Sequence, residues 1–174
     1  LVKIDEISEH LLAAIYFVAV LSGLFSWVLP YFLPQEYAAI QYLVTACMLG
    51  PLFYTLSETT SVGIAIARKT KLSMVASIGA MLINMIGNYL LVPKMGAVGA
   101  AVATAIAFAI FAILKTELSR AVWRDIKRKR AYTVILVLLL VTISSTILQY
   151  KLFFLSIWFL LLIFGIVSFK QSLI

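Results

Sequence analysis

The chain has 174 residues, of which 64% are hydrophobic and only 12% are charged, with a net charge of +7 and a mean hydropathy of +1.10. Soluble domains carry roughly 25% charged residues, so this composition excludes an ordinary water-soluble globule. The apolar runs are continuous rather than alternating, and backbone groups in lipid must be paired, which favours α-helices over a β-barrel. The predicted fold class is therefore all-α, a polytopic membrane helix bundle.

Six apolar runs are long enough to cross a bilayer, which takes about 20 residues per helix. In chain order they cover residues 11–33, 37–67, 72–92, 98–114, 132–149 and 152–169. The second run, of about 30 residues, would span roughly 45 Å as one helix. It must tilt, protrude or bend, and Gly50-Pro51 supplies a physical cause for a bend.

Basic residues gather at alternate connections between these spans. Twelve of the fourteen Lys and Arg residues fall on one side of the predicted topology, and only Lys94 and Lys151 fall on the other. The positive-inside rule places the basic side, with both ends of the chain, in the cytoplasm.

Residues 115–131 form a predicted cytoplasmic connector, basic and amphipathic, between the fourth and fifth spans. Such a segment is typical of a helix on the membrane surface, where anionic lipids attract each basic side chain by about 1 kcal/mol. A specific contact with a phosphate-bearing substrate or a partner protein is the alternative. The connector is too short to predict nucleic-acid binding. Residues 132–174 have few polar side chains in mid-span, so we expect two peripheral, lipid-facing helices.

Glu58 is the acidic residue placed well inside a predicted span, about 15 Å along the helix from Arg68. A central charge costs about 2.5 to 3.5 kcal/mol on insertion, so Glu58 should face protein or water. With Tyr54 and Thr59 beside it, Glu58 is a candidate for a substrate cavity or for coupling to protons or sodium. A structural hydrogen bond to a neighbouring helix is the alternative.

Asn84 and Asn88 lie four residues apart and therefore share one helix face. Their amides suit either bridges to other helices or the wall of a polar cavity. The small residues at positions 96, 99, 100, 103 and 107 allow a neighbouring helix to come close. His10 and Cys47 receive no functional role. No spacing of residues indicates a catalytic centre, a metal site or a cofactor site, so we expect a protein that is not an enzyme.

The order and spacing of motifs over roughly residues 40–125 carry a family resemblance. The run LINMIGNYLLVPKMGAVGAAVAT at 82–104, with ETT at 58–60, RKTKL at 68–72 and KTE at 115–117, resembles the C-terminal half of bacterial polysaccharide flippases of the O-antigen type. That family shares a superfamily with multidrug and toxin extruders and with lipid II flippases. Its members have two six-helix lobes that face each other across a central cavity.

The resemblance implies that residues 1–114 are core helices of the second lobe, in the bacterial inner membrane. The substrate would be a polyprenyl-pyrophosphate-linked oligosaccharide, moved from the cytoplasmic to the periplasmic leaflet by alternating access. Since no cation is predicted deep within a span, phosphate contacts are expected at the cytoplasmic rim, from Arg68, Lys69 and Lys71, or from the other lobe. A polysaccharide polymerase and glycosyltransferases are the expected protein partners.

Two other functions stay open. A cation antiporter of the multidrug extrusion type would share the architecture, and acidic residues in the other lobe would favour it. A non-transport membrane subunit of a glycosyltransferase or acyltransferase system would need carboxylates or histidines near the inner face. The cluster Asp5, Glu6 and Glu9 is the local candidate, and we interpret it as solvated residues before the first span.

Overall fold

A computed structural model describes residues 2–123 and 129–169 of the chain. These residues form seven α-helices and two short 3-10 helices, with no strand among them, which confirms the predicted all-α class. The α-helices are α1 (Val2–Phe25), α2 (Ile40–Thr60), α3 (Val62–Ile66), α4 (Lys71–Met95), α5 (Ala97–Val122), α6 (Lys129–Leu148) and α7 (Lys151–Ser168). The 3-10 helices are η1 (Ser26–Tyr31) and η2 (Gln35–Tyr37).

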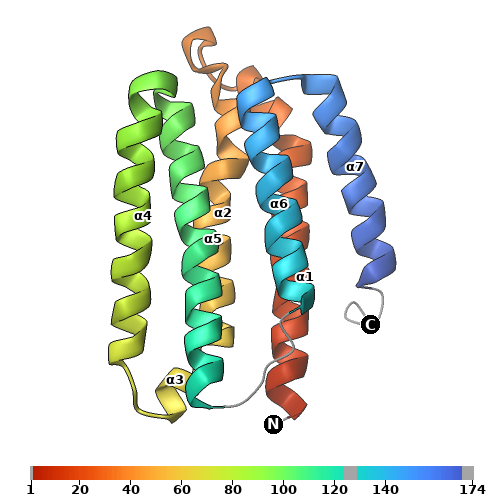
Figure 1. The fold of residues 1–174 in the computed structure, drawn as a ribbon. Helices are drawn as coiled ribbons and strands as arrows, with labels where there is room; N and C mark the ends of the chain where they lie inside the picture. Colours follow the sequence, from red (N-terminus) through yellow and green to blue (C-terminus); the bar gives the residue numbers. More distant parts are fainter. Residues whose placement is uncertain (1, 124–128, 170–174) are drawn as a thin grey trace.

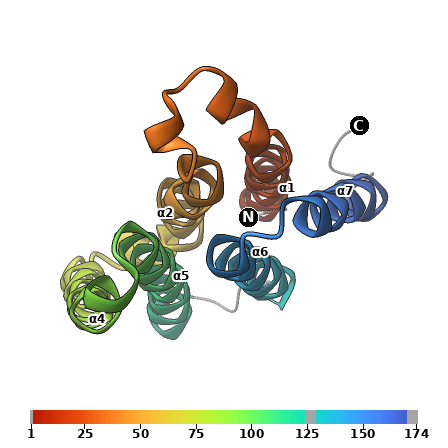
Figure 2. The same ribbon diagram turned by 90° about the horizontal axis from the view of Figure 1, so that it is seen from above.

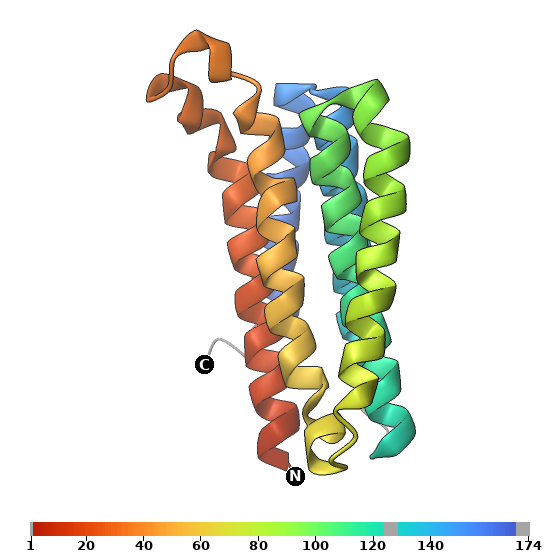
Figure 3. The same cartoon turned by 90° about the vertical axis from the view of Figure 1, so that its left-hand side faces the viewer.

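Six of the helices in this part of the chain are long and apolar enough to cross a membrane: α1 continued by η1, and then α2, α4, α5, α6 and α7. They stand side by side along one direction (Figure 1, Figure 3). The number of spans and their order agree with the six apolar runs, so the chain has the architecture of a multi-pass membrane protein.

The bundle has α4 and α7 at opposite edges when it is seen from above (Figure 2). The helix α4 packs on α5, α5 packs on α2, and α1 packs on both α2 and α7. The core between them contains Leu49 and Phe53 from α2, Ala105 from α5 and Leu138 from α6, each with no exposed surface. Alanines at the buried face of α5 let its neighbours approach closely.

Three further contacts place α6 inside the bundle, against α1, α2 and α5. Leu138, Thr142 and Thr146 of α6 are fully buried. The prediction that residues 132–149 form a peripheral helix is therefore wrong, because lipid-facing and core-facing apolar residues look alike in a sequence. The edge positions belong to α7 and to α4. Little of α4 is buried, since Ala76 is the buried residue along its whole length.

The predicted second span is broken into two helices at Ser61. Helix α2 runs through Pro51 and ends at Thr60, and the one-turn helix α3 follows. Its Gly63 lies so close to Ser119 of α5 that a Cβ atom there would be 2.6 Å from the serine Oγ. The break lets α3 pack against the end of α5 instead of extending beyond the bundle.

Helix α5 is longer than predicted. It continues to Val122, so residues 115–122 of the expected surface connector belong to the span-forming helix, and Lys115 is buried in it. Residues 124–128 of that connector lie outside the described residues. Among described residues, the basic positions 68, 69, 71, 120, 129 and 130 occupy the end where α1 begins, and Lys94 and Lys151 occupy the opposite end, as the charge pattern predicts (Figure 1).

Candidate functional site

A groove of about 810 Å³ lies between α2, α4 and α5. That volume falls within the 300 to 1,000 Å³ that is usual for small-molecule sites. Its lining residues are Tyr54 from α2, Ser77, Ala80, Met81, Asn84, Met85 and Asn88 from α4, and Thr104, Ala107, Phe108 and Phe111 from α5. The lining combines aromatic and thioether groups with hydroxyl and amide groups, so the groove suits an amphipathic ligand.

The sequence of α4 explains this face. Ser77, Met81, Asn84 and Asn88 follow one another at intervals of three or four residues and form one stripe of the helix. On α5 the small side chain of Ala107 faces the same space and leaves room between the helices. The groove therefore results from a polar stripe on an otherwise apolar edge helix.

A short hydrogen-bond chain crosses the groove wall from α4 to α5. Asn88 Nδ2 donates to Asn84 Oδ1 over 2.6 Å, and Asn84 Nδ2 donates to Thr104 Oγ1 over 3.2 Å. Both alternatives considered for the two asparagines are thus realised, because Asn84 bridges two helices while Asn84 and Asn88 line the groove. The bridge fixes the amide orientation that a ligand would meet.

An ion pair stands one helical turn beyond Tyr54. Lys115 Nζ of α5 donates to Glu58 Oε1 of α2 over 2.6 Å. The Lys115 ammonium also lies 5.1 Å from the ring centre of Phe111 and 5.9 Å from that of Tyr54. These two rings are stacked, with centres 5.9 Å apart and planes within 4° of parallel. Tyr54 and Phe111 therefore connect the groove to the charged pair.

Glu58 contacts Lys115 of the neighbouring helix, and its side chain is 49% exposed. The sequence does not predict this partner, because the apolar run of the fourth span ends at residue 114 and Lys115 falls in the predicted connector. The signal that could have found it is the helical spacing of Lys115 from Phe111 and Ser119, which extends the buried face of α5 by two turns.

Thr59 does not join the groove. Its hydroxyl donates to the Leu56 carbonyl within α2 over 2.8 Å, and the side chain is not part of the lining. The neighbouring Thr60 faces α5 instead, with its Oγ1 atom 2.7 Å from that of Thr116. This buried contact holds α2 and α5 together just beyond the ion pair.

Arg68 and Lys69, in the connection between α3 and α4, and Lys71, the first residue of α4, are exposed. None of them lines the groove, so they belong to the rim of the bundle rather than to the site itself. Arg68 has a left-handed backbone with φ of 54°, and the Lys69 N–H donates to the Ile64 carbonyl over 3.1 Å. This arrangement is a Schellman-type end to α3.

Comparison of the chain with protein-family models, with curated proteins and with solved structures found no match. The groove and the ion pair are therefore the features that point to a function.

Proposed function

We propose that this chain is one lobe of a membrane flippase for an anionic, lipid-linked oligosaccharide of the polyprenyl-pyrophosphate class. The observation that supports it is the groove between α2, α4 and α5, which is lined by amide, hydroxyl and aromatic groups, together with the buried Lys115 next to it, whose ammonium lies near two of the lining rings, those of Tyr54 and Phe111. A lipid-linked sugar phosphate offers the matching groups: hydroxyls, an apolar tail and a negative charge.

Each part of the ligand has a counterpart in the groove or in the ion pair beside it. Asn84 and Asn88 offer amide groups, which donate and accept hydrogen bonds as sugar hydroxyls require. The exposed thioethers of α4, those of Met81 and Met85, suit an isoprenoid chain. The cation Lys115 suits a phosphate oxygen, since hydrogen bonds between charged groups are about twice as strong as neutral ones.

The ion pair supplies a way to bind the phosphate without leaving a bare charge in the membrane. In the empty site, Glu58 provides the counter-charge of Lys115, whose side chain is 5% exposed. The phosphate of an arriving substrate replaces the carboxylate, and Glu58, which is 49% exposed, turns into the groove. Exchange of one anion for another keeps the buried ammonium paired throughout.

The basic end of the bundle fits the cytoplasmic side of a bacterial inner membrane. Arg68, Lys69 and Lys71 at that rim would attract the pyrophosphate and anionic membrane lipids before the substrate enters. A second lobe would close the cavity and rock against this one during transport. Glycosyltransferases would deliver the substrate and a polysaccharide polymerase would receive it.

The charge balance of the site favours this function over a cation antiporter of the multidrug extrusion type. A cation site needs a carboxylate without a fixed counter-charge, but Glu58 is neutralised by Lys115 at 2.6 Å. With that pair formed, the groove presents neutral polar groups, and the lysine beside the groove is the group that accepts a new anion.

The test uses cells that lack their own surface-polysaccharide flippase and carry the full-length protein or a variant. We expect Lys115→Gln to abolish surface polysaccharide and to trap lipid-linked oligosaccharide in the inner leaflet. Lys94→Gln, at the opposite end of the bundle, is the matched control and should leave both unchanged. Normal surface polysaccharide with Lys115→Gln would overturn the proposal, and efflux of a fluorescent organic cation from the cells that depends on Glu58 would support the antiporter.

A further inference from the structure

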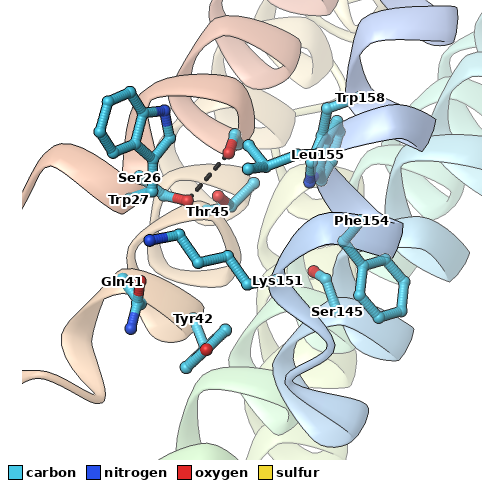
Figure 4. Close-up of a pocket in the computed structure, with 11 residues that line it drawn as sticks. Ser26, Trp27, Gln41, Tyr42, Thr45, Ser145, Lys151, Phe154, Leu155 and Trp158 are labelled. Atoms are coloured by element: carbon cyan, nitrogen blue, oxygen red, sulfur yellow. Dashed lines mark hydrogen bonds between the residues drawn. The ribbon is translucent and has the colours of Figure 1, made fainter.

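A second pocket lies at the opposite end of the bundle from the basic rim, between η1, α2, α6 and α7 (Figure 4). Its volume of about 30 Å³ has room for one small polar group. The residues around it include Trp27, Tyr42 and Trp158, ring types that gather where membrane meets water. The pocket is separate from the groove, since the two share no lining residue.

Lys151 is the cation of this pocket. Its ammonium lies 5.5 Å from the ring centre of Trp27, and within the described ranges no carboxylate forms a salt bridge with it. It is also the first residue of α7, and no side chain caps that helix. The N-terminus of a helix carries partial positive charge, so a lysine there is mildly unfavourable, and an anion bound beside it would offset that cost.

Thr45 of α2 provides an independent indication of a ligand. Its side chain is 3% exposed and lines the pocket, and its hydroxyl has no hydrogen-bond partner among the residues that the structure describes. Thr55 and Thr59 of the same helix show the usual alternative, in which the hydroxyl donates to a carbonyl of its own helix. The Thr45 hydroxyl is instead left available on the pocket wall.

These groups meet in one place. Figure 4 shows the side chains of Ser26, Thr45 and Lys151 converging on one space, where Ser26 Oγ already donates to the Gly23 carbonyl over 2.8 Å. An ammonium, a spare hydroxyl and the start of a helix form a set of donors directed at an acceptor with negative charge. The small volume admits the oxygens of one phosphate rather than a larger anion.

We propose that this pocket binds the phosphate group of an anionic membrane lipid in the leaflet opposite the basic rim. The position suits a lipid because lipid phosphates lie at the level of the Trp and Tyr side chains. The exposed apolar side chains of α7, including Leu152, Phe153 and Phe159, continue away from the pocket and offer a path for the acyl chains. The site is independent of the proposed flippase function.

The test measures retention of phosphatidylglycerol by the detergent-purified full-length protein, using native mass spectrometry during a lipid titration. We expect Lys151→Gln to weaken retention roughly tenfold, as for the loss of one charge-assisted hydrogen bond. The isosteric Thr45→Val should weaken it by about threefold, in line with the loss of a neutral bond. Lys94→Gln, which removes a cation at the same end but outside the pocket, should leave it unchanged.

Two further measurements decide whether the bound phosphate belongs to a lipid or is the free ion, and whether a loss of binding is specific to the pocket. Inorganic phosphate is titrated against bound phosphatidylglycerol: persistence of the lipid supports a lipid site, whereas displacement at millimolar phosphate overturns the lipid as the ligand and assigns the free ion. Equal losses for Lys151→Gln and Lys94→Gln, or no loss for Lys151→Gln, would overturn the proposal. If Lys151→Gln unfolds in a thermal scan, Thr45→Val carries the test alone, and its unchanged retention would overturn the site.

Discussion

Lys115 and Glu58 form a close ion pair in which the two side chains differ in exposure. The ammonium lies 2.6 Å from the carboxylate, with the lysine side chain 5% exposed and the glutamate side chain 49% exposed. The lysine therefore relies on its partner for a counter-charge, whereas about half of the glutamate side chain stays exposed. Removing one partner or the other should have different consequences for stability.

Loss of the glutamate should destabilise the protein more than loss of the lysine. Glu58→Gln leaves a buried ammonium with a weaker acceptor, whereas Lys115→Gln leaves a carboxylate that is about half exposed and depends less on its partner. Thermal unfolding of the purified variants in one detergent measures the order. The double variant Glu58→Gln, Lys115→Gln is the control and should be more stable than Glu58→Gln alone. A lower melting temperature for Lys115→Gln than for Glu58→Gln would contradict this reading of the pair.

Glu58 also gives the test of ion coupling. If its carboxylate couples transport to a proton or sodium gradient, Glu58→Gln should leave residual transport that no longer responds to collapse of the gradient. The measurement is surface polysaccharide in complemented cells with and without an ionophore. Full complementation by Glu58→Gln that still depends on the gradient would count against coupling through this residue.

The six spans could be predicted from the sequence because length and apolar composition decide whether a helix crosses a membrane. The shared face of Asn84 and Asn88 could also be predicted, since it follows from helical spacing alone. Both properties belong to a single helix. Neither requires knowledge of what that helix packs against.

The partners of the helices could not be predicted in the same way. In water, burial separates apolar from polar faces, but in lipid both the core face and the outer face are apolar. For this reason the fully buried Leu138 of α6 gave no signal that distinguished it from the exposed Leu160 of α7. The charge of Lys115 was misleading too, because a lysine that follows an apolar run usually marks the end of a span.

The bridge from Asn84 to Thr104 should contribute little to stability and more to function. Interhelical hydrogen bonds in membranes average about 0.6 kcal/mol, so Thr104→Val should lower the free energy of unfolding by roughly that amount. The same variant frees the Asn84 amide to turn, and we expect a clear fall in transport. Ser156→Ala is a suitable control, since Ser156 bonds within α7, away from the groove. A loss of stability without a loss of transport would assign the bridge to packing only.

The close approach of α4 and α5 depends on Gly99. A Cβ atom at this position would lie 2.5 Å from the Leu91 carbonyl oxygen, which is a backbone atom and cannot turn aside. Gly99→Ala should therefore destabilise the protein by roughly 1 to 3 kcal/mol, as overpacking does. At Gly79 the nearest atom to such a Cβ is Leu114 Cδ1 at 3.4 Å, so Gly79→Ala should be neutral or stabilising. Equal effects of the two substitutions on thermal unfolding would contradict this, because they would show that α4 and α5 can move apart to accommodate a Cβ atom at Gly99.

Arg68 allows the charge of the rim to be separated from the shape of its backbone. Its φ of 54° is unfavourable for any residue with a Cβ atom but is free of strain for glycine. Arg68→Gly and Arg68→Ala remove the same positive charge, but only the glycine variant relieves the strain, so it should be the more stable of the two by up to about 1 kcal/mol. If Arg68 attracts the phosphate of the substrate, both variants should reduce transport equally at low substrate, and added salt should narrow their difference from the unsubstituted protein. If transport instead falls more in Arg68→Ala than in Arg68→Gly, it follows stability and not the lost charge. The role of Arg68 would then be only to end α3.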